Sequence, residues 1–141
     1  MLNIPMFLKP KKDVVHLYDH YTLRQTLEKM EVYRFSAMPI IDKEGRYIGT
    51  ITEGDLLYAI KNIYHLDLKL AENVPLSAIP RYKDNMPVRI DAKVEDLTDI
   101  LMEQNFIPVL DDRGLFIGIV TRKAVLTEIF AKKEAHPSAQ A

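Results

Sequence analysis

The chain has 141 residues, 48% of them apolar and 28% charged, with a formal net charge of −1. This composition is typical of a globular protein with a substantial core, and a charge near zero argues against non-specific binding to nucleic acid or anionic membranes. The absence of cysteine excludes disulfides, thiolate catalysis and Cys-ligated zinc, and it fits a cytoplasmic location.

The N-terminal stretch MLNIPMFLKPKK places its apolar residues before its lysines. A signal peptide needs the reverse order and a longer apolar core, so we expect this stretch to belong to the mature protein. No window approaches the 18 or so apolar residues of a membrane span, and none is expected.

The first half of the chain predicts alternating strands and helices. Thr22 and Gln25 have the spacing of a capping box at the start of an amphipathic helix. The predicted elements are a strand in VVHLY (14–18), a helix over 22–33, a strand in AMPII (37–41), a turn at KEG (43–45), a strand in YIGTIT (47–52) and a helix over 53–64.

The second half predicts the same order of elements. They are a strand in VRI (88–90), a helix over 94–104, a strand in FIPVL (106–110), a turn at DRG (112–114), a strand in LFIGIVT (115–121) and a helix over 122–133. Between the halves, the three prolines of 65–87 predict irregular chain with one helical turn at PLSAI (75–79). We therefore expect two repeats, 13–66 and 87–133, joined by a linker at 67–86 and followed by a polar tail at 134–141.

The two halves are also similar in sequence. Residues 39–60 align with 108–129 at a constant offset of 69, without a gap. The identical pairs are Pro39/Pro108, Asp42/Asp111, Gly45/Gly114, Ile48/Ile117, Gly49/Gly118, Thr52/Thr121, Leu57/Leu126 and Ile60/Ile129. The chain is therefore an internal repeat of a β-α-β-β-α unit.

Thr52 and Asp55 have two interpretations that do not exclude each other. As an N-cap, the Thr52 hydroxyl accepts a bond from a free backbone N–H, and Asp55 reaches back to complete a capping box. As a ligand site, the helix start presents N–H groups and positive partial charge, while the Asp55 carboxylate can accept bonds from neighbouring ribose hydroxyls.

The second copy keeps Thr121 as a cap but has Ala124 where the aspartate is expected. Its first helical turn carries Arg122 and Lys123, and cations there oppose the helix dipole. An anion bound over this helix start would resolve that conflict. Alternatively, both side chains simply point into water.

Two copies of β-α-β-β-α, each with a proline-led strand, a D-x-x-G turn and a G-x-x-T strand end, resemble the CBS domain family. The T-x-x-D ending is complete in the first copy. The resemblance covers about residues 13–133 and implies an α/β (α+β) fold, with the two repeats packed about a pseudo-twofold axis as in a Bateman module. It also implies two clefts able to bind AMP, ADP, ATP, S-adenosylmethionine or cyclic di-AMP.

The same resemblance assigns site residues. In the first copy, Ala37 and Met38 would line the adenine, Thr52 would lie near phosphate, and Asp55 would hold the ribose hydroxyls. Met38 has core filling as an equal alternative.

In the second copy, Phe106, Ile107 and Thr121 take the corresponding positions, with core packing as the simpler role for Phe106. Because Ala124 cannot bond a hydroxyl, we expect unequal sites: a nucleoside grip in the first copy and a phosphate-led grip through Arg122 and Lys123 in the second.

Other features leave alternatives open. Arg81 and Tyr82 of the linker could close over a ligand, although a solvated loop is the simpler interpretation. The four histidines show no metal-ligand spacing, so no metal is expected. The broad apolar stripe of 55–66 fits either a well-buried helix or a homodimer interface.

The sequence thus favours a cytoplasmic regulatory module, a homodimer, that senses an adenine nucleotide. With no further domain after the second repeat, it would signal to a partner protein. The alternative is a ligand-free protein-interaction or structural module. No nucleophile, catalytic base or metal pattern supports an enzyme.

Overall fold

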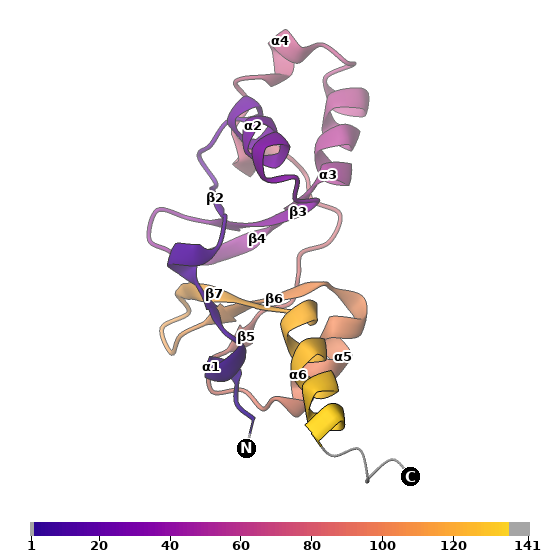
Figure 1. The fold of residues 1–141 in the computed structure, drawn as a ribbon. Helices are drawn as coiled ribbons and strands as arrows, with labels where there is room; N and C mark the ends of the chain where they lie inside the picture. The colour runs from indigo at the N-terminus through magenta and orange to yellow at the C-terminus, as the bar shows by residue number, and fades with distance from the viewer. Residues whose placement is uncertain (1, 136–141) are drawn as a thin grey trace. The chain divides into compact units, whose positions relative to one another are not determined.

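The computed structural model describes residues 2–135, which divide into two compact units (Figure 1). The first-repeat unit comprises Val15–Asn85 with Gly114–Phe116. The second-repeat unit comprises the chain up to Val14, Met86–Arg113 and the chain from Ile117 onward. Of the tail predicted at 134–141, residues 136–141 lie outside the described part.

The first-repeat unit contains a three-stranded sheet in the order β2-β3-β4. Strand β3 pairs in parallel with β2 and antiparallel with β4. The elements of the unit are β2 (Leu17–Tyr18), α2 (Leu23–Tyr33), β3 (Ala37–Ile41), β4 (Tyr47–Thr52), α3 (Glu53–Tyr58), a π-helical turn (Ala59–Ile63), α4 (Leu68–Ala71) and a 3-10 turn (Leu76–Ala78).

Helices α2 and α3 lie on the same side of this sheet (Figure 1), and both contribute side chains to the core cluster that covers it. The capping box predicted at Thr22 and Gln25 starts α2, and Leu23 and Met30 of that helix are buried. The buried cluster comprises Leu17, Leu23, Met30, Met38, Ile40, Ile51, Leu56, Ala59, Ala71, Leu76 and Ile79. Leu76 and Ile79 bring the predicted PLSAI turn into the core, which anchors the segment that follows it.

The second-repeat unit contains a four-stranded sheet in the order β1-β7-β6-β5. Its elements are α1 (Ile4–Phe7), β1 (Lys9–Pro10), a 3-10 turn (Lys11–Asp13), β5 (Val88–Arg89), α5 (Glu95–Glu103), β6 (Phe106–Leu110), β7 (Phe116–Thr121) and α6 (Arg122–Ala135). The buried cluster comprises Ile4, Phe7, Leu97, Leu101, Ile107, Val109, Val120 and Val125.

The N-terminal stretch packs with the second repeat although it precedes the first in sequence. Strand β1 pairs antiparallel with β7, with Lys9 opposite Ile119 and Pro10 opposite Gly118. A side chain at Gly118, whose φ is +153°, would collide with the Lys9 carbonyl oxygen. The glycine is therefore required where the two strands meet.

The α/β fold with two β-α-β-β-α repeats is confirmed, and the structure adds α1, β1 and α4, which the sequence did not predict. Two of the predicted elements also differ from the prediction. The predicted strand at 14–18 shortens to Leu17–Tyr18, because the Val14 N–H closes the preceding 3-10 turn on Lys11. The helix predicted over 53–64 changes to π-helical hydrogen bonding from Ala59 onward. Within residues 2–135, no helix combines the length and apolar character needed to cross a membrane.

Residues 80–85, called the strap below, cross β4 without forming a strand. Asp84 Oδ1 accepts the Thr50 N–H at 2.9 Å, and the Tyr47 hydroxyl donates to the Asn85 carbonyl at 2.8 Å. A Cβ at Gly49 would lie within 3.0 Å of Asp84 Oδ1. Gly49 thus lets the strap approach the strand this closely.

We expect Gly49→Ala to lower the free energy of unfolding by about 1–3 kcal/mol, because it displaces Asp84 and leaves the buried Thr50 N–H unpaired. Gly54→Ala is the matched control, since its Cβ would meet only Thr52 Oγ1 at 3.7 Å. Urea unfolding of both variants measures the difference. Equal stabilities would contradict this role of Gly49.

Tyr47 predicts a change of stability at alkaline pH. Desolvation by burial raises the pKa of Tyr47 to about 12. The unfolded chain releases this proton near pH 10, so the contribution is complete below about pH 10 and is lost as the pH rises toward the folded value. We expect urea unfolding to show this loss in the wild type and Tyr82→Phe but not in Tyr47→Phe. If the free energy of unfolding depended on pH in the same way in all three proteins, Tyr47 would not be the group responsible.

Candidate functional site

The start of α3 forms the capping box that the sequence predicts. The Asp55 N–H donates to Thr52 Oγ1 at 3.1 Å, and the Thr52 N–H donates to Asp55 Oδ2 at 3.0 Å. The Glu53 N–H donates to the Ser36 carbonyl at 2.9 Å. The helix start therefore satisfies Glu53 N–H and Asp55 N–H within the chain, which reduces what it offers to an anion.

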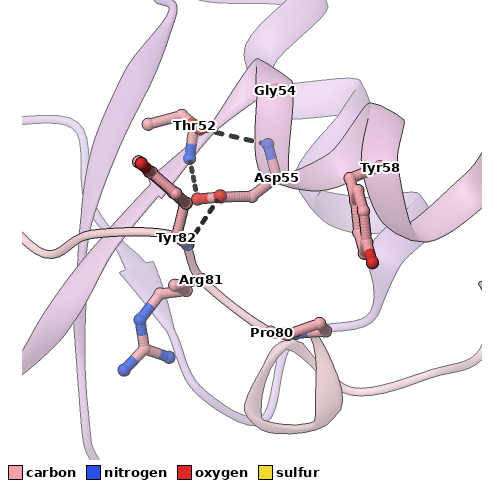
Figure 2. A pocket seen from close by; sticks show the side chains of 7 residues that line it. All are labelled: Thr52, Gly54, Asp55, Tyr58, Pro80, Arg81 and Tyr82. Atoms are coloured by element: carbon pink, nitrogen blue, oxygen red, sulfur yellow. Dashed lines mark hydrogen bonds between the residues drawn. The ribbon is translucent and has the colours of Figure 1, made fainter.

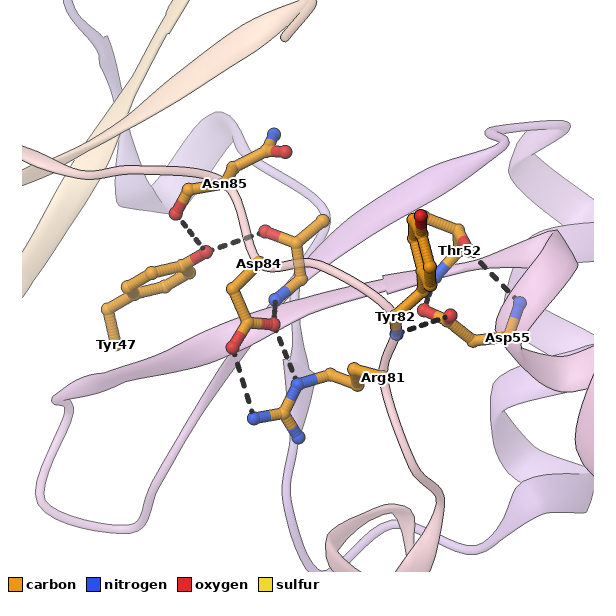
Figure 3. Close-up of polar contacts among 8 residues, drawn as sticks. Tyr47, Thr52, Asp55, Arg81, Tyr82, Asp84 and Asn85 are labelled. Carbon is orange, nitrogen blue, oxygen red and sulfur yellow. Dashed lines mark hydrogen bonds and ion pairs between the residues drawn. The ribbon is translucent and has the colours of Figure 1, made fainter. Parts of the chain in front are cut away.

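The second oxygen of Asp55 binds the strap. Asp55 Oδ1 accepts the Tyr82 N–H at 3.0 Å, across 27 positions in sequence (Figure 3). The side chain is buried, with 6% of the residue exposed. This carboxylate thus holds together the end of β4, the first turn of α3 and the strap.

A pocket of about 430 Å³ lies beside this carboxylate (Figure 2). Tyr58 and Tyr82 lie across the opening from each other, with the backbone of the strap below. The residues lining it are Thr52, Gly54, Asp55, Tyr58, Pro80, Arg81 and Tyr82. Its volume falls in the range of small-molecule sites.

Arg81 lines the pocket, and its guanidinium points toward Asp84 (Figure 3). Nε lies 2.7 Å from Asp84 Oδ1, and Nη2 lies 3.3 Å from Oδ2. Tyr82, in contrast, is 96% exposed. The strap therefore combines the solvated loop that the sequence favours with residues that border a pocket.

Two other residues assigned to the first site lie on β3. Ala37 is half-buried and pairs with Thr52 across the β3–β4 ladder, next to the pocket. Met38 is fully buried in the core cluster, as its core-filling interpretation anticipates. A ligand would reach Met38 only after local rearrangement.

Arg122 lies in the first turn of α6, where a cation opposes the helix dipole, and the structure shows a compensation that the sequence did not predict. Thr121 Oγ1 accepts the Ala124 N–H at 3.1 Å, which confirms the cap. Arg122 turns back, and its Nε donates to the Leu101 carbonyl in the last turn of α5 at 2.7 Å. A cation at the C-terminal end of a helix complements the dipole, so α5 compensates Arg122.

The remaining assigned residues of the second repeat separate into two groups. Phe106 is 7% exposed and Ile107 is fully buried in the core. Thr121, Arg122 and Lys123 border an open hollow of about 530 Å³ together with Asn105, Leu126, Thr127 and Phe130. Only the second group faces space that a ligand could enter.

Three residues that line the first-repeat pocket, Gly54, Tyr58 and Pro80, were not predicted from the sequence. Tyr58 lies in the apolar stripe of its helix, where its spacing signals packing rather than a ligand. The only available signal for Pro80 is its place at the start of the IPRYKDNMP loop. Among the described residues, no three His, Asp or Glu side chains gather as a metal site.

Two solved structures of similar fold are complexes with an adenine nucleotide. The structure is similar to that of CbpB in complex with c-di-AMP, with a TM-score of 0.88 and 23% identity over 98% of this chain and 91% of that one. It is also similar to CBSX2 in complex with AMP, with a TM-score of 0.75 and 21% identity over 94% of this chain and 99% of that one.

In sequence, the chain is 25% identical over 130 residues to inosine-5'-monophosphate dehydrogenase of Methanocaldococcus jannaschii, with 91% of this chain aligned. The chain spans only 23% of the length of that enzyme. A sequence model of the CBS domain matches residues 7–62 and 79–131. Two matched repeats over most of the chain establish that it belongs to the CBS domain family.

Proposed function

We propose that the chain is a regulatory module that binds an adenine nucleotide in the pocket of the first repeat. The observation that carries this proposal is the Asp55 carboxylate at the wall of a pocket of about 430 Å³. The nucleotide would be sensed rather than transformed, and its occupancy would be communicated to a partner protein. We further propose a cytoplasmic location, supported by the absence of cysteine.

Asp55 retains the capacity to bind ribose. A carboxylate offers about four lone-pair sites, and the N–H groups of Thr52 and Tyr82 use two of them. Neighbouring ribose hydroxyls could use the others, or displace the Tyr82 N–H. Bonds to a charged acceptor are stronger than neutral ones, so this contact would supply a large share of the affinity.

The two tyrosines suit a planar base. Tyr58 is 58% exposed and Tyr82 is 96% exposed, so both rings can change rotamer at little packing cost. Stacking between an aromatic ring and a base contributes about 1–3 kcal/mol in single-stranded nucleic-acid sites. The choice of adenine rests on CbpB and CBSX2, which contain c-di-AMP and AMP in the same fold.

The second repeat would contribute less to nucleoside binding. Ala124 supplies no acceptor for ribose hydroxyls at the position equivalent to Asp55. The Arg122 Nε is engaged by the Leu101 carbonyl, which leaves Lys123 as the more available cation at that hollow. We therefore propose one nucleoside site per chain, with at most an anion contact in the second repeat.

Signalling would follow from the strap. It is bonded to Asp55 at Tyr82 and leads directly to Met86, whose backbone N–H and carbonyl both bond the Gln104 side chain in the second-repeat unit. A ligand that displaces or tightens the strap would shift the populations of its conformations by its differential affinity for them.

A ligand-free interaction module is the alternative, because the chain itself satisfies both oxygens of Asp55. Saturable binding of a nucleotide would exclude it. Calorimetric titration with AMP, ADP, ATP, S-adenosylmethionine and cyclic di-AMP is the direct test, with GMP as the control for the base.

We also propose a homodimer through the apolar grooves beside α3 and α6. Leu57 is 64% and Leu126 44% exposed, at equivalent positions of the two repeats. Glu53 borders the first groove, and Arg122 occupies the equivalent position in the second. These opposite charges favour a second copy of the chain that sets its second repeat against the first repeat of its partner.

For the nucleotide site, we expect Asp55→Asn to weaken AMP binding by roughly tenfold or more, because it removes a charged acceptor. Asp67→Asn is the matched control, since Asp67 caps α4 through Lys69 and Leu70 and does not line the pocket. Calorimetry on both variants separates ligand contact from cap loss. Equal AMP affinity in wild type and Asp55→Asn would contradict the assignment.

For the dimer, we expect Leu57→Asp to yield monomers in sedimentation experiments, since it places a charge in the apolar groove. Leu70→Asp is the control, because Leu70 is 61% exposed on α4 and outside that groove. Monomeric wild-type protein, or dissociation by both variants alike, would refute this interface.

A further inference from the structure

We propose that Arg81 recognises the anionic group of the nucleotide and that Asp84 is its internal competitor. This inference rests on the proposed nucleotide site. It adds a specificity residue that distinguishes phosphorylated from unphosphorylated nucleosides, and a carboxylate of the chain that must yield when the ligand binds.

The pocket needs a cation if its ligand is an anion. Among the described residues that line the pocket, Asp55 is the acidic side chain and Arg81 is the basic one. Glu53 adds a further negative charge in the first turn of α3. A phosphate placed near these carboxylates would be repelled unless a cation accompanied it, and Arg81 is in the wall of the same pocket.

In the structure, the Arg81 guanidinium is paired with a carboxylate of the chain itself. Its side chain is 21% exposed, and Nε and Nη2 are both directed at the Asp84 carboxylate. Figure 3 shows this pair on one side of the strap and the Asp55–Tyr82 bond on the other. Asp84 thus takes the place on the guanidinium that a ligand anion would need.

The pair can open without loss of the strap. Asp84 is 38% exposed, and an ion pair so close to water contributes little net stability because solvent screens it. Asp84 also keeps a separate bond, in which Oδ1 accepts the Thr50 N–H at 2.9 Å. Arg81 can therefore exchange one carboxylate for a phosphate while Asp84 continues to cover β4.

Arginine is suited to such an exchange. Its planar guanidinium presents five N–H donors and binds carboxylate and phosphate with similar bidentate geometry. A phosphate carries more negative charge than a carboxylate at neutral pH, which favours the exchange when a nucleotide arrives. An unphosphorylated nucleoside offers no group to displace Asp84.

The test compares AMP with adenosine by calorimetry in two variants. Asp84→Asn keeps an oxygen for the Thr50 N–H but removes the competing charge. We expect it to tighten AMP binding roughly twofold to fivefold, the range for a weak exposed ion pair, and to leave adenosine unchanged. We expect Arg81→Gln to weaken AMP by about tenfold and to leave adenosine unchanged.

Two further variants control for net charge. Glu44→Gln removes an acidic group paired with Arg46, and Arg24→Gln removes an exposed arginine paired with Glu28 and Glu72. Neither Glu44 nor Arg24 lines the pocket. AMP affinity should be unchanged in both.

The outcomes separate this inference from the proposed function. If Asp55→Asn weakens AMP but Arg81→Gln does not, the nucleotide site stands and Arg81 is not its anion residue. If Asp84→Asn weakens AMP or leaves it unchanged, Asp84 is not a competitor. If wild-type protein binds neither AMP nor adenosine, both the proposed function and this inference fail.

Discussion

The Asp55 carboxylate is the constraint on which the first-repeat site depends. One oxygen closes the capping box with Thr52, and the other holds the backbone of Tyr82 in the strap. The buried charge is stabilised because each oxygen accepts a backbone N–H. In consequence, a group that bonds this carboxylate acts on a helix start and on the strap together.

In each repeat a different kind of segment packs against the glycine-containing strand. Gly49 and Gly118 occupy equivalent positions, and each admits a segment from outside its repeat to the surface of the strand. At Gly118 the segment is a true strand, β1, paired by main chain. At Gly49 it is the strap, held by the Asp84 and Asn85 bonds to Thr50 and Tyr47. Two separate hydrogen bonds that involve side chains open more readily than the main-chain pairing of two strands. The strap is therefore the more adjustable of the two segments, and it is the one that contacts the Asp55 carboxylate.

The second repeat lacks the features on which the proposed nucleoside site of the first repeat depends. Ala124 removes the acceptor, and Arg122, at the position of Glu53, is turned onto the end of α5. The proposed asymmetry between sites follows from these two positions alone.

Local patterns predicted most of the fold and part of the site. The capping boxes and the proline-led strands depend on residues close in sequence, and the repeat is found by comparing the sequence with itself, so the sequence alone is enough to recognise all three. The strap could not be recognised in this way, because its bond to Thr50 joins residues 34 positions apart and no local pattern marks Asp84 as a partner. The pairing of β1 with the second repeat was missed for the same reason, although the apolar Ile4 and Phe7 hinted that the N-terminus is buried. The compensation of Arg122 by α5 likewise required the tertiary contact.

The amide NMR spectrum during addition of AMP tests the central claim most directly. If the nucleotide binds at Asp55, the largest shifts will occur at the amides of Thr52, Asp55 and Tyr82, which share one carboxylate. Shifts confined to Thr121, Arg122 and Lys123, or no saturable shift at all, would contradict a nucleotide site in the first repeat.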